Sequence, residues 1–214
     1  MSCGCDRSGY GRFFNRRFAR RAAKRYRKRG LDGPTQRIAD VVAAHGVEGA
    51  TVLEIGGGVG ELQLELLKAG AARATNLELS PEYEEEARSL AEEAGVRHRV
   101  DRRVHDIAAD PDVVEAADVV VLNRVVCCYP DYERLLGAAA DHAHRLVVFS
   151  YPPRNAVSRA FVTAANAVQA VLRNDFRSFT HPPEAMLAVL DSRGLRRAYE
   201  HHGLVWQIAG AERA

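Results

Sequence analysis

Residues Thr51–Gly60, TVLEIGGGVG, decide the fold of this chain. A short apolar run with Val52, Leu53 and Ile55 ends at four glycines within five residues, and a helical pattern follows at once in Glu61–Ala69. This order predicts a buried strand that turns sharply into a helix at the carboxyl edge of a sheet. Glycine permits so tight a turn and lets a ligand approach the backbone, while the amide groups of the following helix point into the turn. We therefore predict a site for a nucleotide-like cofactor here.

The spacing of the glycines separates the cofactor classes. Neither Gly56 nor Gly58 begins the G-x-G-x-x-G of a dinucleotide site, because the sixth position is not glycine in either register. The Gly-Lys-Ser/Thr ending of a P-loop is also missing. What stands here is E-x-G-x-G-x-G, from Glu54 to Gly60, which resembles motif I of the class I S-adenosylmethionine-dependent methyltransferases. A glycine-rich turn without a ligand is the alternative, and it is disfavoured because clustered glycines weaken packing unless close approach is needed.

Strands and helices alternate along the remainder of the chain. Five strand–helix steps, followed by two strands without a helix between them, predict a doubly wound, Rossmann-like α/β sheet that is mostly parallel with one antiparallel edge strand. The methyltransferase family has this plan, with seven strands and added N-terminal helices, and the resemblance covers roughly residues 35–210. The expected strands after the first are Arg73–Leu79, one within Val96–Asp106 at a sheet edge, Asp118–Val126, Arg145–Tyr151 and a pair within Leu195–Ala209. The expected helices besides Glu61–Ala69 are Phe13–Arg29, Thr35–His45, Ser80–Ala94, a short one near Pro111–Ala116, Asp131–Ala143, Asn155–Arg173 with an apolar face, and Pro183–Ser192.

The resemblance implies that the cofactor lies at the carboxyl ends of the first four strands. Glu78, at the end of the second strand, would accept hydrogen bonds from the ribose hydroxyls, a task that suits a carboxylate. Asp106 would accept from the adenine amino group, although its surroundings, HDI, depart from the commoner Gly-Asp-Ala pattern. Asn123 and Arg124, in the motif IV position, would flank the methionine part of the cofactor. The complete set of cofactor contacts that we expect is Glu54, Gly56, Gly57, Gly58, Gly60, Glu78, Leu79, Asp106, Ile107, Asn123 and Arg124.

Two residues are candidates for a catalytic base. Methyl transfer from a sulfonium depends mainly on positioning, and a base is needed only when the acceptor must lose a proton. His181, in the THPP turn before the last helix, and Tyr129, just after motif IV, are placed for that role. His181 is alternatively a capping or surface residue, and Tyr129 alternatively a wall of the site. No metal site is predicted.

The four cysteines leave three readings open. Cys127 and Cys128 are buried small hydrophobic residues, or a substrate-facing thiol, or soft ligands completed by Cys3 and Cys5 in a chemistry like that of arsenite methyltransferases. Neighbouring cysteines are poor partners for ordinary disulfides, so we expect a reducing, cytoplasmic location. No transmembrane helix or secretory signal is expected, because the chain has no run of about 18 apolar residues and its N-terminus is basic.

Charge is distributed unevenly along the chain. Residues 12–29 hold ten lysines and arginines and no acid, which leaves 20 of the 30 basic residues against all 28 acids elsewhere. We expect residues 1–33 to form a basic helical arm, with 1–11 mobile, and residues 34–214 to form the methyltransferase domain. The arm is a docked amphipathic element with solvated charges, a basic lid over the acceptor site, or a surface for nucleic acid or anionic membrane.

The sequence therefore predicts an enzyme that transfers a methyl group from S-adenosylmethionine to a small, anionic metabolite, most simply at oxygen. The short N-terminal extension without large insertions is similar to small-molecule members of the family, loosely including the magnesium-protoporphyrin O-methyltransferases. One alternative is an RNA methyltransferase that grips RNA with the basic arm; the absence of an N-P-P-Y or D-P-P-Y motif argues against base N-methylation. The other is a cofactor-binding partner protein without catalytic activity.

Overall fold

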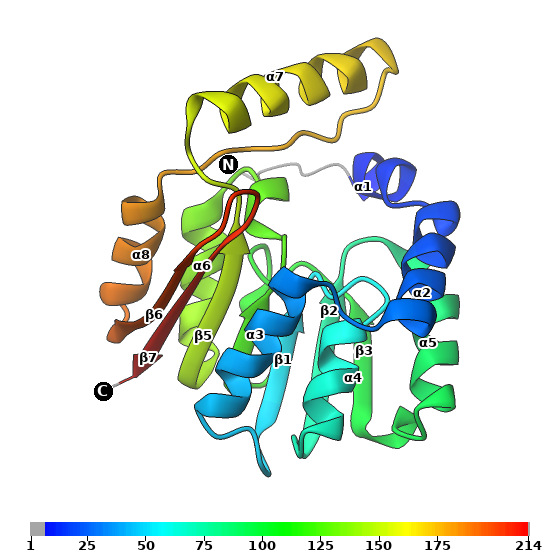
Figure 1. Ribbon diagram of the computed structural model, residues 1–214, viewed down its shortest axis with the longest axis vertical. Coiled ribbons are helices and arrows are strands. Elements are labelled where there is room, and N and C mark those ends of the chain that lie inside the picture. Colours follow the sequence, from blue (N-terminus) through cyan, green and yellow to red (C-terminus); the bar gives the residue numbers. More distant parts are fainter. Residues whose placement is uncertain (1–6, 214) are drawn as a thin grey trace.

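The computed structural model describes residues 7–213, which form a central sheet with helices on both faces (Figure 1). The strands are β1 Thr51–Ile55, β2 Arg73–Glu78, β3 Val100–Val104, β4 Ala117–Leu122, β5 Ala143–Tyr151, β6 Leu195–His202 and β7 Gln207–Arg213. The helices are α1 Arg7–Phe13, α2 Arg16–Arg29, α3 Gly33–Ala44, α4 Glu61–Lys68, α5 Glu84–Glu93, α6 Tyr132–Asp141, α7 Ala156–Val171 and α8 Pro183–Asp191.

The seven strands lie in the order β3-β2-β1-β4-β5-β7-β6. Strands β1 to β5 pair in parallel, whereas β7 is antiparallel to both β5 and β6. The predicted seven-stranded, mostly parallel fold is confirmed, with β3 at an edge as expected; the antiparallel strand β7 lies between β5 and the other edge strand, β6. The order reverses between β1 and β4, and in open sheets ligands bind at the carboxyl ends of strands beside such a reversal.

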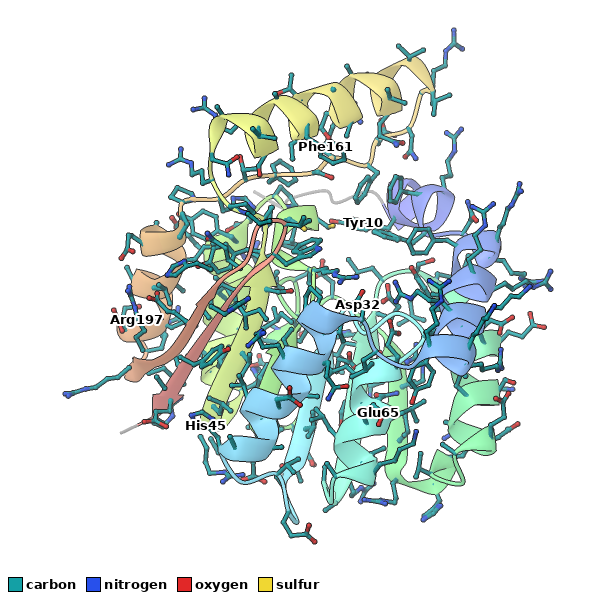
Figure 2. The ribbon with its side chains drawn as sticks, viewed as in Figure 1. Tyr10, Asp32, His45, Glu65, Phe161 and Arg197 are labelled. Carbon is teal, nitrogen blue, oxygen red and sulfur yellow. The ribbon has the colours of Figure 1, made fainter. Side chains whose placement is uncertain are left out.

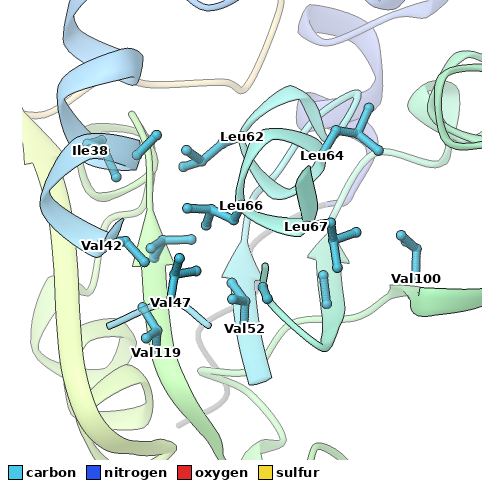
Figure 3. Close-up of a cluster of buried hydrophobic side chains, with 14 of the residues drawn as sticks. Ile38, Val42, Val47, Val52, Leu62, Leu64, Leu66, Leu67, Val100 and Val119 are labelled. Atoms are coloured by element: carbon cyan, nitrogen blue, oxygen red, sulfur yellow. The ribbon is translucent and has the colours of Figure 1, made fainter. Parts of the chain in front are cut away.

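The core has two layers because side chains of the central strands alternate between the faces of the sheet. Val52, Val119 and Val121 belong to the cluster under α2, α3, α4 and α5, whereas Leu53 and Val120 belong to the cluster under α6 and α8. Figure 3 shows the first cluster, in which leucines of α4 and aliphatic side chains of α3 surround β1. The sheet is thus covered on both sides, and its carboxyl edge is left for the site.

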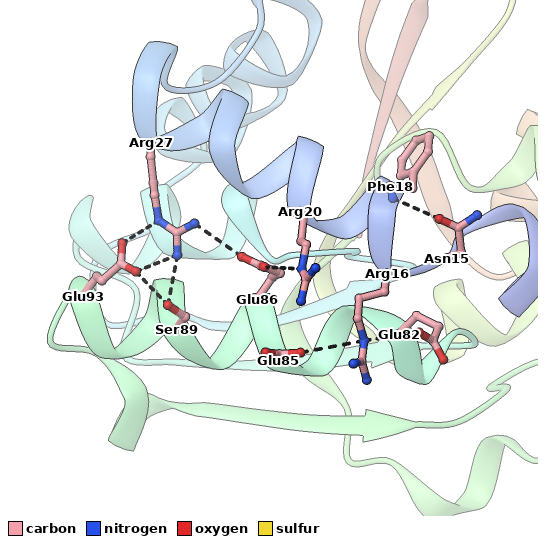
Figure 4. Close-up of polar contacts among 10 residues, drawn as sticks. All are labelled: Asn15, Arg16, Phe18, Arg20, Arg27, Glu82, Glu85, Glu86, Ser89 and Glu93. Atoms are coloured by element: carbon pink, nitrogen blue, oxygen red, sulfur yellow. Dashed lines mark hydrogen bonds and ion pairs between the residues drawn. The ribbon is translucent and has the colours of Figure 1, made fainter.

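Helix α2 carries the basic stretch and is docked on the domain. Ala19, Ala23 and Tyr26 are buried in the same cluster as α3 and α4. On the flank of the helix, Arg27 meets Glu93 at 2.6 Å, and the other pairs that Figure 4 shows are Arg16 with Glu82 and Glu85, and Arg20 and Arg27 with Glu86. Exposed pairs of this kind each contribute about 0–1 kcal/mol, so the buried small residues hold the helix in place. The boundary expected at residue 33 stays a prediction.

The N-terminal segment differs from the expectation. Helix α1 occupies residues 7–13, although the sequence predicts mobility for residues 1–11. The single helix predicted from Phe13 is wrong, because the chain breaks at Asn15, whose side-chain oxygen caps α2 by accepting from the Phe18 amide (3.1 Å). Cys3 and Cys5 lie outside the described residues.

Two further boundaries are corrected. The short helix expected near Pro111–Ala116 is a 3₁₀ turn, Pro111–Val113. The strand expected to reach Val126 ends at Leu122, because Arg124 adopts a positive φ of 62° and leaves the extended conformation. That early end exposes the motif IV residues at the sheet edge.

Helix α7 forms as predicted, but its apolar face is not covered. None of its residues is buried, and Phe161 is 73% exposed. The helix is joined to the following segment by Asn166, whose amide group donates to the Ser178 carbonyl (2.9 Å) and accepts from the Ser178 amide (2.8 Å). Figure 1 shows that α7 projects beyond the carboxyl edge of the sheet.

Two phenylalanine substitutions distinguish the packed sheet from the uncovered helix. Phe149 in β5 is fully buried, so Phe149→Ala should lower the free energy of unfolding by about 3–5 kcal/mol. Phe161→Ala on α7 removes a side chain that contacts little, and should cost less than about 0.5 kcal/mol. Urea unfolding followed by circular dichroism measures both, and similar losses would contradict the exposed placement of α7.

Candidate functional site

The glycine turn after β1 has no room for side chains beneath it. A Cβ on Gly57 would lie 2.7 Å from the carboxyl carbon of Glu54, and it would also meet the Asn76 amide. Gly58 has a φ of 54° and its backbone lies against the Tyr83 ring, with 3.5 Å from a built Cβ to that ring. The sequence here is glycine because the backbone itself forms one wall of the site.

Glu54 supports this turn from below rather than reaching outward. It is buried, and its Oε2 accepts from the side-chain amide of Asn76 (3.1 Å) and the backbone amide of Gln63 (3.3 Å). Burial, together with the nearby Glu61 carboxylate, raises the pKa of Glu54 to about 8. The side-chain oxygens of Asn76 and Gln63 have no donor among the described residues.

Glu78 is fixed at the end of β2 by three backbone amides. Its Oε2 accepts from Gly58 (2.8 Å), and its Oε1 accepts from Leu79 (2.9 Å) and Ser80 (3.1 Å). Burial raises the pKa of this carboxyl, although the three amide bonds act in the opposite direction. Glu78 thus ties the glycine turn to β2 and still lines the cavity described below.

Asp106, Tyr129 and His181 form a chain of contacts. The Tyr129 hydroxyl donates to both carboxylate oxygens of Asp106 (3.2 and 3.1 Å), and its carbonyl accepts from Nε2 of His181 (2.9 Å). His181 stacks on Phe179 and lies near Tyr132, and burial lowers the pKa of its imidazole. The structure brings Tyr129 to the cavity beside Asp106 but does not place His181 among the lining residues.

Asn123 and Arg124 tie the end of β4 to the start of α3. Asn123 accepts from the Ser150 hydroxyl (3.0 Å) and donates to the Thr35 hydroxyl (3.1 Å), which in turn donates to Asp32 (2.7 Å). Arg124 donates to the same Asp32 at 2.7 Å. Burial tends to raise the pKa of Asp32, but the bonds from Thr35 and Arg124 outweigh it, and the net shift is downward. A charged network therefore forms the floor beside the glycine turn.

A cavity of about 390 Å³ joins these groups at the carboxyl ends of the strands. The predicted residues that line it are Glu54, Gly56, Gly57, Gly58, Glu78, Leu79, Asp106, Ile107, Asn123, Arg124 and Tyr129. Gly60 and His181 are not among its lining residues; Gly60 instead bonds to the Gly57 carbonyl (2.7 Å) and shapes the turn. The predicted residues thus line the same cavity, and their contacts with a cofactor stay predictions.

The opposite wall comes from the N-terminal helices. The residues that line the cavity from α1, α2 and the break between them are Tyr10, Phe14, Phe18, Arg21 and Arg25. Four of these residues lie within the helix predicted over Phe13–Arg29, whereas nothing in the sequence signalled Tyr10, whose hydroxyl donates to the carbonyl of residue 128 (2.7 Å). The arm thus forms this wall of the cavity, which we call the lid, and contributes two arginines to it.

The cysteine pair lies beside this lid. Cys127 is buried, Cys128 is half-buried and reaches the cavity, and the two sulfurs are 3.6 Å apart. The hydrogen bond with Cys127, together with burial, raises the pKa of the Cys128 thiol. Within residues 7–213, no group of three or more His, Cys, Asp or Glu side chains is placed to hold a metal ion.

A family model described as a methyltransferase domain matches residues 16–206, most of the chain. The chain belongs to this methyltransferase family. Together with the strand order, this confirms the predicted class I S-adenosylmethionine-dependent methyltransferase.

Solved structures share the fold across most of the chain. A magnesium protoporphyrin IX methyltransferase from Synechocystis PCC 6803, with bound S-adenosylhomocysteine, is 20% identical, with a TM-score of 0.70 over 92% of this chain and 96% of that one. An O-methyltransferase family protein from Burkholderia thailandensis is 21% identical, with a TM-score of 0.68 over 92% of this chain and 62% of that one. A mitomycin 7-O-methyltransferase is 27% identical, with a TM-score of 0.61 over 87% of this chain and 56% of that one.

One curated relative matches a shorter segment. The ribosomal protein L11 methyltransferase of Enterobacter sp. (strain 638) is 36% identical over 77 residues, which are 36% of this chain and 25% of that protein. The match thus spans only a quarter of the relative.

In the part of the chain from residue 7 to 213, no helix has the length and apolar character needed to cross a membrane.

The residues present fit S-adenosylmethionine. The side-chain-free turn at residues 56–58 leaves the backbone open to a ligand, and the buried carboxylate of Glu78 lies beside it, where a ribose diol would find an acceptor. Asp106 offers carboxylate oxygens to an amino group at the other side of the cavity. These individual contacts remain predictions.

The raised pKa of Glu54 makes stability depend on pH. A carboxyl whose pKa is raised by folding binds its proton more tightly in the folded state, so its contribution is complete below its ordinary pKa of 4.5 and is lost as the pH rises toward about 8. We expect the free energy of unfolding to fall over this window by up to about 1.4 kcal/mol per pH unit relative to Glu54→Gln. Urea unfolding at several pH values measures this, with Glu115→Gln, an exposed acid, as the control. Parallel curves for wild type and Glu54→Gln would contradict the neutral buried acid.

A single methyl group should disturb the turn. Gly57→Ala presses on Glu54 and Asn76, so we expect affinity for S-adenosylmethionine to fall about tenfold or more. Gly33→Ala is the matched control, because a Cβ there meets nothing within 4 Å. Titration calorimetry measures both affinities, and equal affinities would show that the turn does not bind the cofactor.

Proposed function

We propose that this enzyme transfers the methyl group of S-adenosylmethionine to an oxygen of a small acceptor that carries carboxylate or phosphate groups. The observation that carries the proposal is the lid, because one cavity runs from the glycine turn to the aromatic residues, Arg21 and Arg25 of the N-terminal helices. Aromatic rings suit the body of an organic acceptor, and the guanidinium groups suit its anionic groups.

The two arginines differ in what they already bind. Arg25 lies 3.2 Å from Glu61 and 3.6 Å from Asp32, so much of its charge is paired within the protein. Arg21 is exposed, and no acidic group in the described part of the chain lies within ion-pair distance of it. Arg21 is therefore the cation that we expect to meet an anionic acceptor.

The sulfonium supplies an activated methyl group, and the protein supplies position. The glycine turn, Glu78 and the network of Asn123 and Arg124 would hold the cofactor, while the lid would hold the acceptor and exclude water. Oxygen as the methylated atom is supported by the names of two relatives of similar fold, which are O-methyltransferases.

Catalysis by His181 or Tyr129 as a general base is also a proposal. A carbonyl only accepts hydrogen bonds, so Nε2 of His181 carries the hydrogen that points to the Tyr129 carbonyl, and only Nδ1 is left to accept a proton. The Tyr129 hydroxyl donates to Asp106, which suits a wall of the cofactor site better than a base. Methylation of an anionic acceptor oxygen requires neither residue as a base.

RNA as the acceptor is a weaker candidate. Arg16, Arg20 and Arg27 are paired with glutamates that follow β2, so much of the charge that would grip RNA is already neutralised. A cytoplasmic location belongs to the same proposal, and the free thiols of Cys127 and Cys128 are suited to a reducing compartment.

Charge reversal on the lid tests the acceptor class. With labelled S-adenosylmethionine and a panel of small carboxylates and phosphate esters, we expect Arg21→Glu to lower kcat/KM for the acceptor by roughly 10- to 100-fold, the worth of one charged contact, without changing affinity for the cofactor. Lys24→Glu changes the charge of the same helix equally, but Lys24 does not line the cavity, and its kcat/KM should stay near that of wild type.

Equal losses in the two variants would show that the net charge of the helix, rather than a contact with Arg21, matters. Methylation of RNA but of no small molecule in the panel would overturn the proposal in favour of the RNA enzyme.

A further inference from the structure

Helix α7 presents an apolar stripe that nothing in the described chain covers. Val157, Phe161, Val168, Val171 and Leu172 recur at helical spacing and are all exposed, at 78% for Val157 and 83% for Val171. Figure 2 shows α7 as the outermost helix of the view, with side chains, Phe161 among them, extending from it. An exposed stripe of this size on an otherwise well-packed protein marks an interaction surface.

The other side of α7 holds it to the protein. Asn166 makes its two hydrogen bonds with the backbone of Ser178, in the segment that leads to α8. At 3.6 residues per turn, each of the five stripe residues lies about 120° or more around the helix from Asn166. The half-buried residues of the helix, Ser158, Val162, Ala165, Asn166 and Gln169, mark the side that is attached to the protein, whereas the five stripe residues are exposed.

The charges at the two ends of the stripe are mostly positive. Arg154 precedes the helix and Arg173 follows it, whereas Arg159 lies on the side of Asn166, and one exposed acid, Asp175, comes two residues after Arg173. At the C-terminal end of the helix, Arg12 of α1 donates to the Arg173 carbonyl (3.0 Å), which brings a third guanidinium to this surface. Apolar side chains with a net positive charge at their ends suit a partner that is apolar inside and anionic outside.

A lipid surface has this chemistry. The helix has 16 residues and is too short to cross a bilayer, which needs roughly 20. An amphipathic helix with basic residues beside an apolar face lies instead in the interface, where the apolar side chains enter the headgroup boundary and the arginines meet anionic lipids. We propose that α7 is a docking helix that lays its apolar stripe on an anionic membrane surface.

The turn between β6 and β7 adds to this surface at the base of the helix. Gln207, which follows the turn, pairs with Tyr151, the last residue of β5, just before α7 departs. Leu204 and Val205 of the turn are exposed, and residues 203–206 carry no charge. These two side chains would add apolar contact area to the proposed membrane surface without adding a charge.

Vesicle sedimentation tests the proposal with the full chain. We expect wild type to sediment with vesicles of phosphatidylglycerol and phosphatidylcholine, to stay in solution with phosphatidylcholine alone, and to be released by 1 M salt, where screening acts within about 3 Å. Val157→Glu/Val171→Glu should reduce the partition coefficient by roughly tenfold or more, because it removes apolar contacts and adds charges that anionic lipids repel.

The matched control is Val104→Glu/Val113→Glu, which adds the same charges at two other exposed valines, 42% and 49% exposed, away from α7. It should keep binding to vesicles near that of wild type. Three results would overturn the proposal: no sedimentation of wild type with anionic vesicles, equal losses in the two double variants, or a dimer in light scattering that only the α7 variant dissociates, which would assign the stripe to a second copy of the chain.

Discussion

The glycine turn after β1 can exist only because a buried acid and two amides fill the space that its side chains would occupy. Glu54 at the end of β1 and Asn76 on β2 lie directly beneath Gly57, where a Cβ would displace them, and the side-chain amide of Gln63 on α4 takes the place of a Cβ on Gly60. Glu54 accepts from both Asn76 and the Gln63 backbone amide. Desolvation of Glu54 is the cost of this arrangement, and it is reduced by keeping the carboxyl protonated. Strand, turn and helix are thereby locked into one unit whose exposed surface is bare backbone.

The rest of the site is built outward from this unit by polar side chains at strand ends. Glu78 reaches across from β2 to the Gly58 amide, and Asn123 and Arg124 connect β4 to the cap of α3. Carboxyl ends of parallel strands lie at one edge of the sheet, so short side chains suffice. The N-terminal helices then cover this edge with aromatic residues and arginines, so one cavity has a wall of strand ends and a wall of helical side chains.

Much of this follows from local sequence, and the remainder does not. Apolar runs, glycine breaks and the spacing from Gly56 to Glu78 predicted the sheet and the residues of one wall, because each signal lies within a single strand–turn–helix unit. The partners of Arg124 and of residue 128 are Asp32 and Tyr10, which lie 92 and 118 positions away and leave no local pattern. Periodicity also predicted the apolar face of α7, but it cannot say whether another element covers that face.

The measurement that tests the account most directly is calorimetric titration of the purified protein with S-adenosylmethionine and S-adenosylhomocysteine, repeated on Gly58→Arg and Glu78→Ala. Gly58→Arg fills the space beside Tyr83, and Glu78→Ala removes the carboxylate that joins the turn to β2. The account predicts one site per chain in wild type and loss of binding in both variants, with the fold retained by circular dichroism. A well-folded wild type that binds neither compound would contradict it.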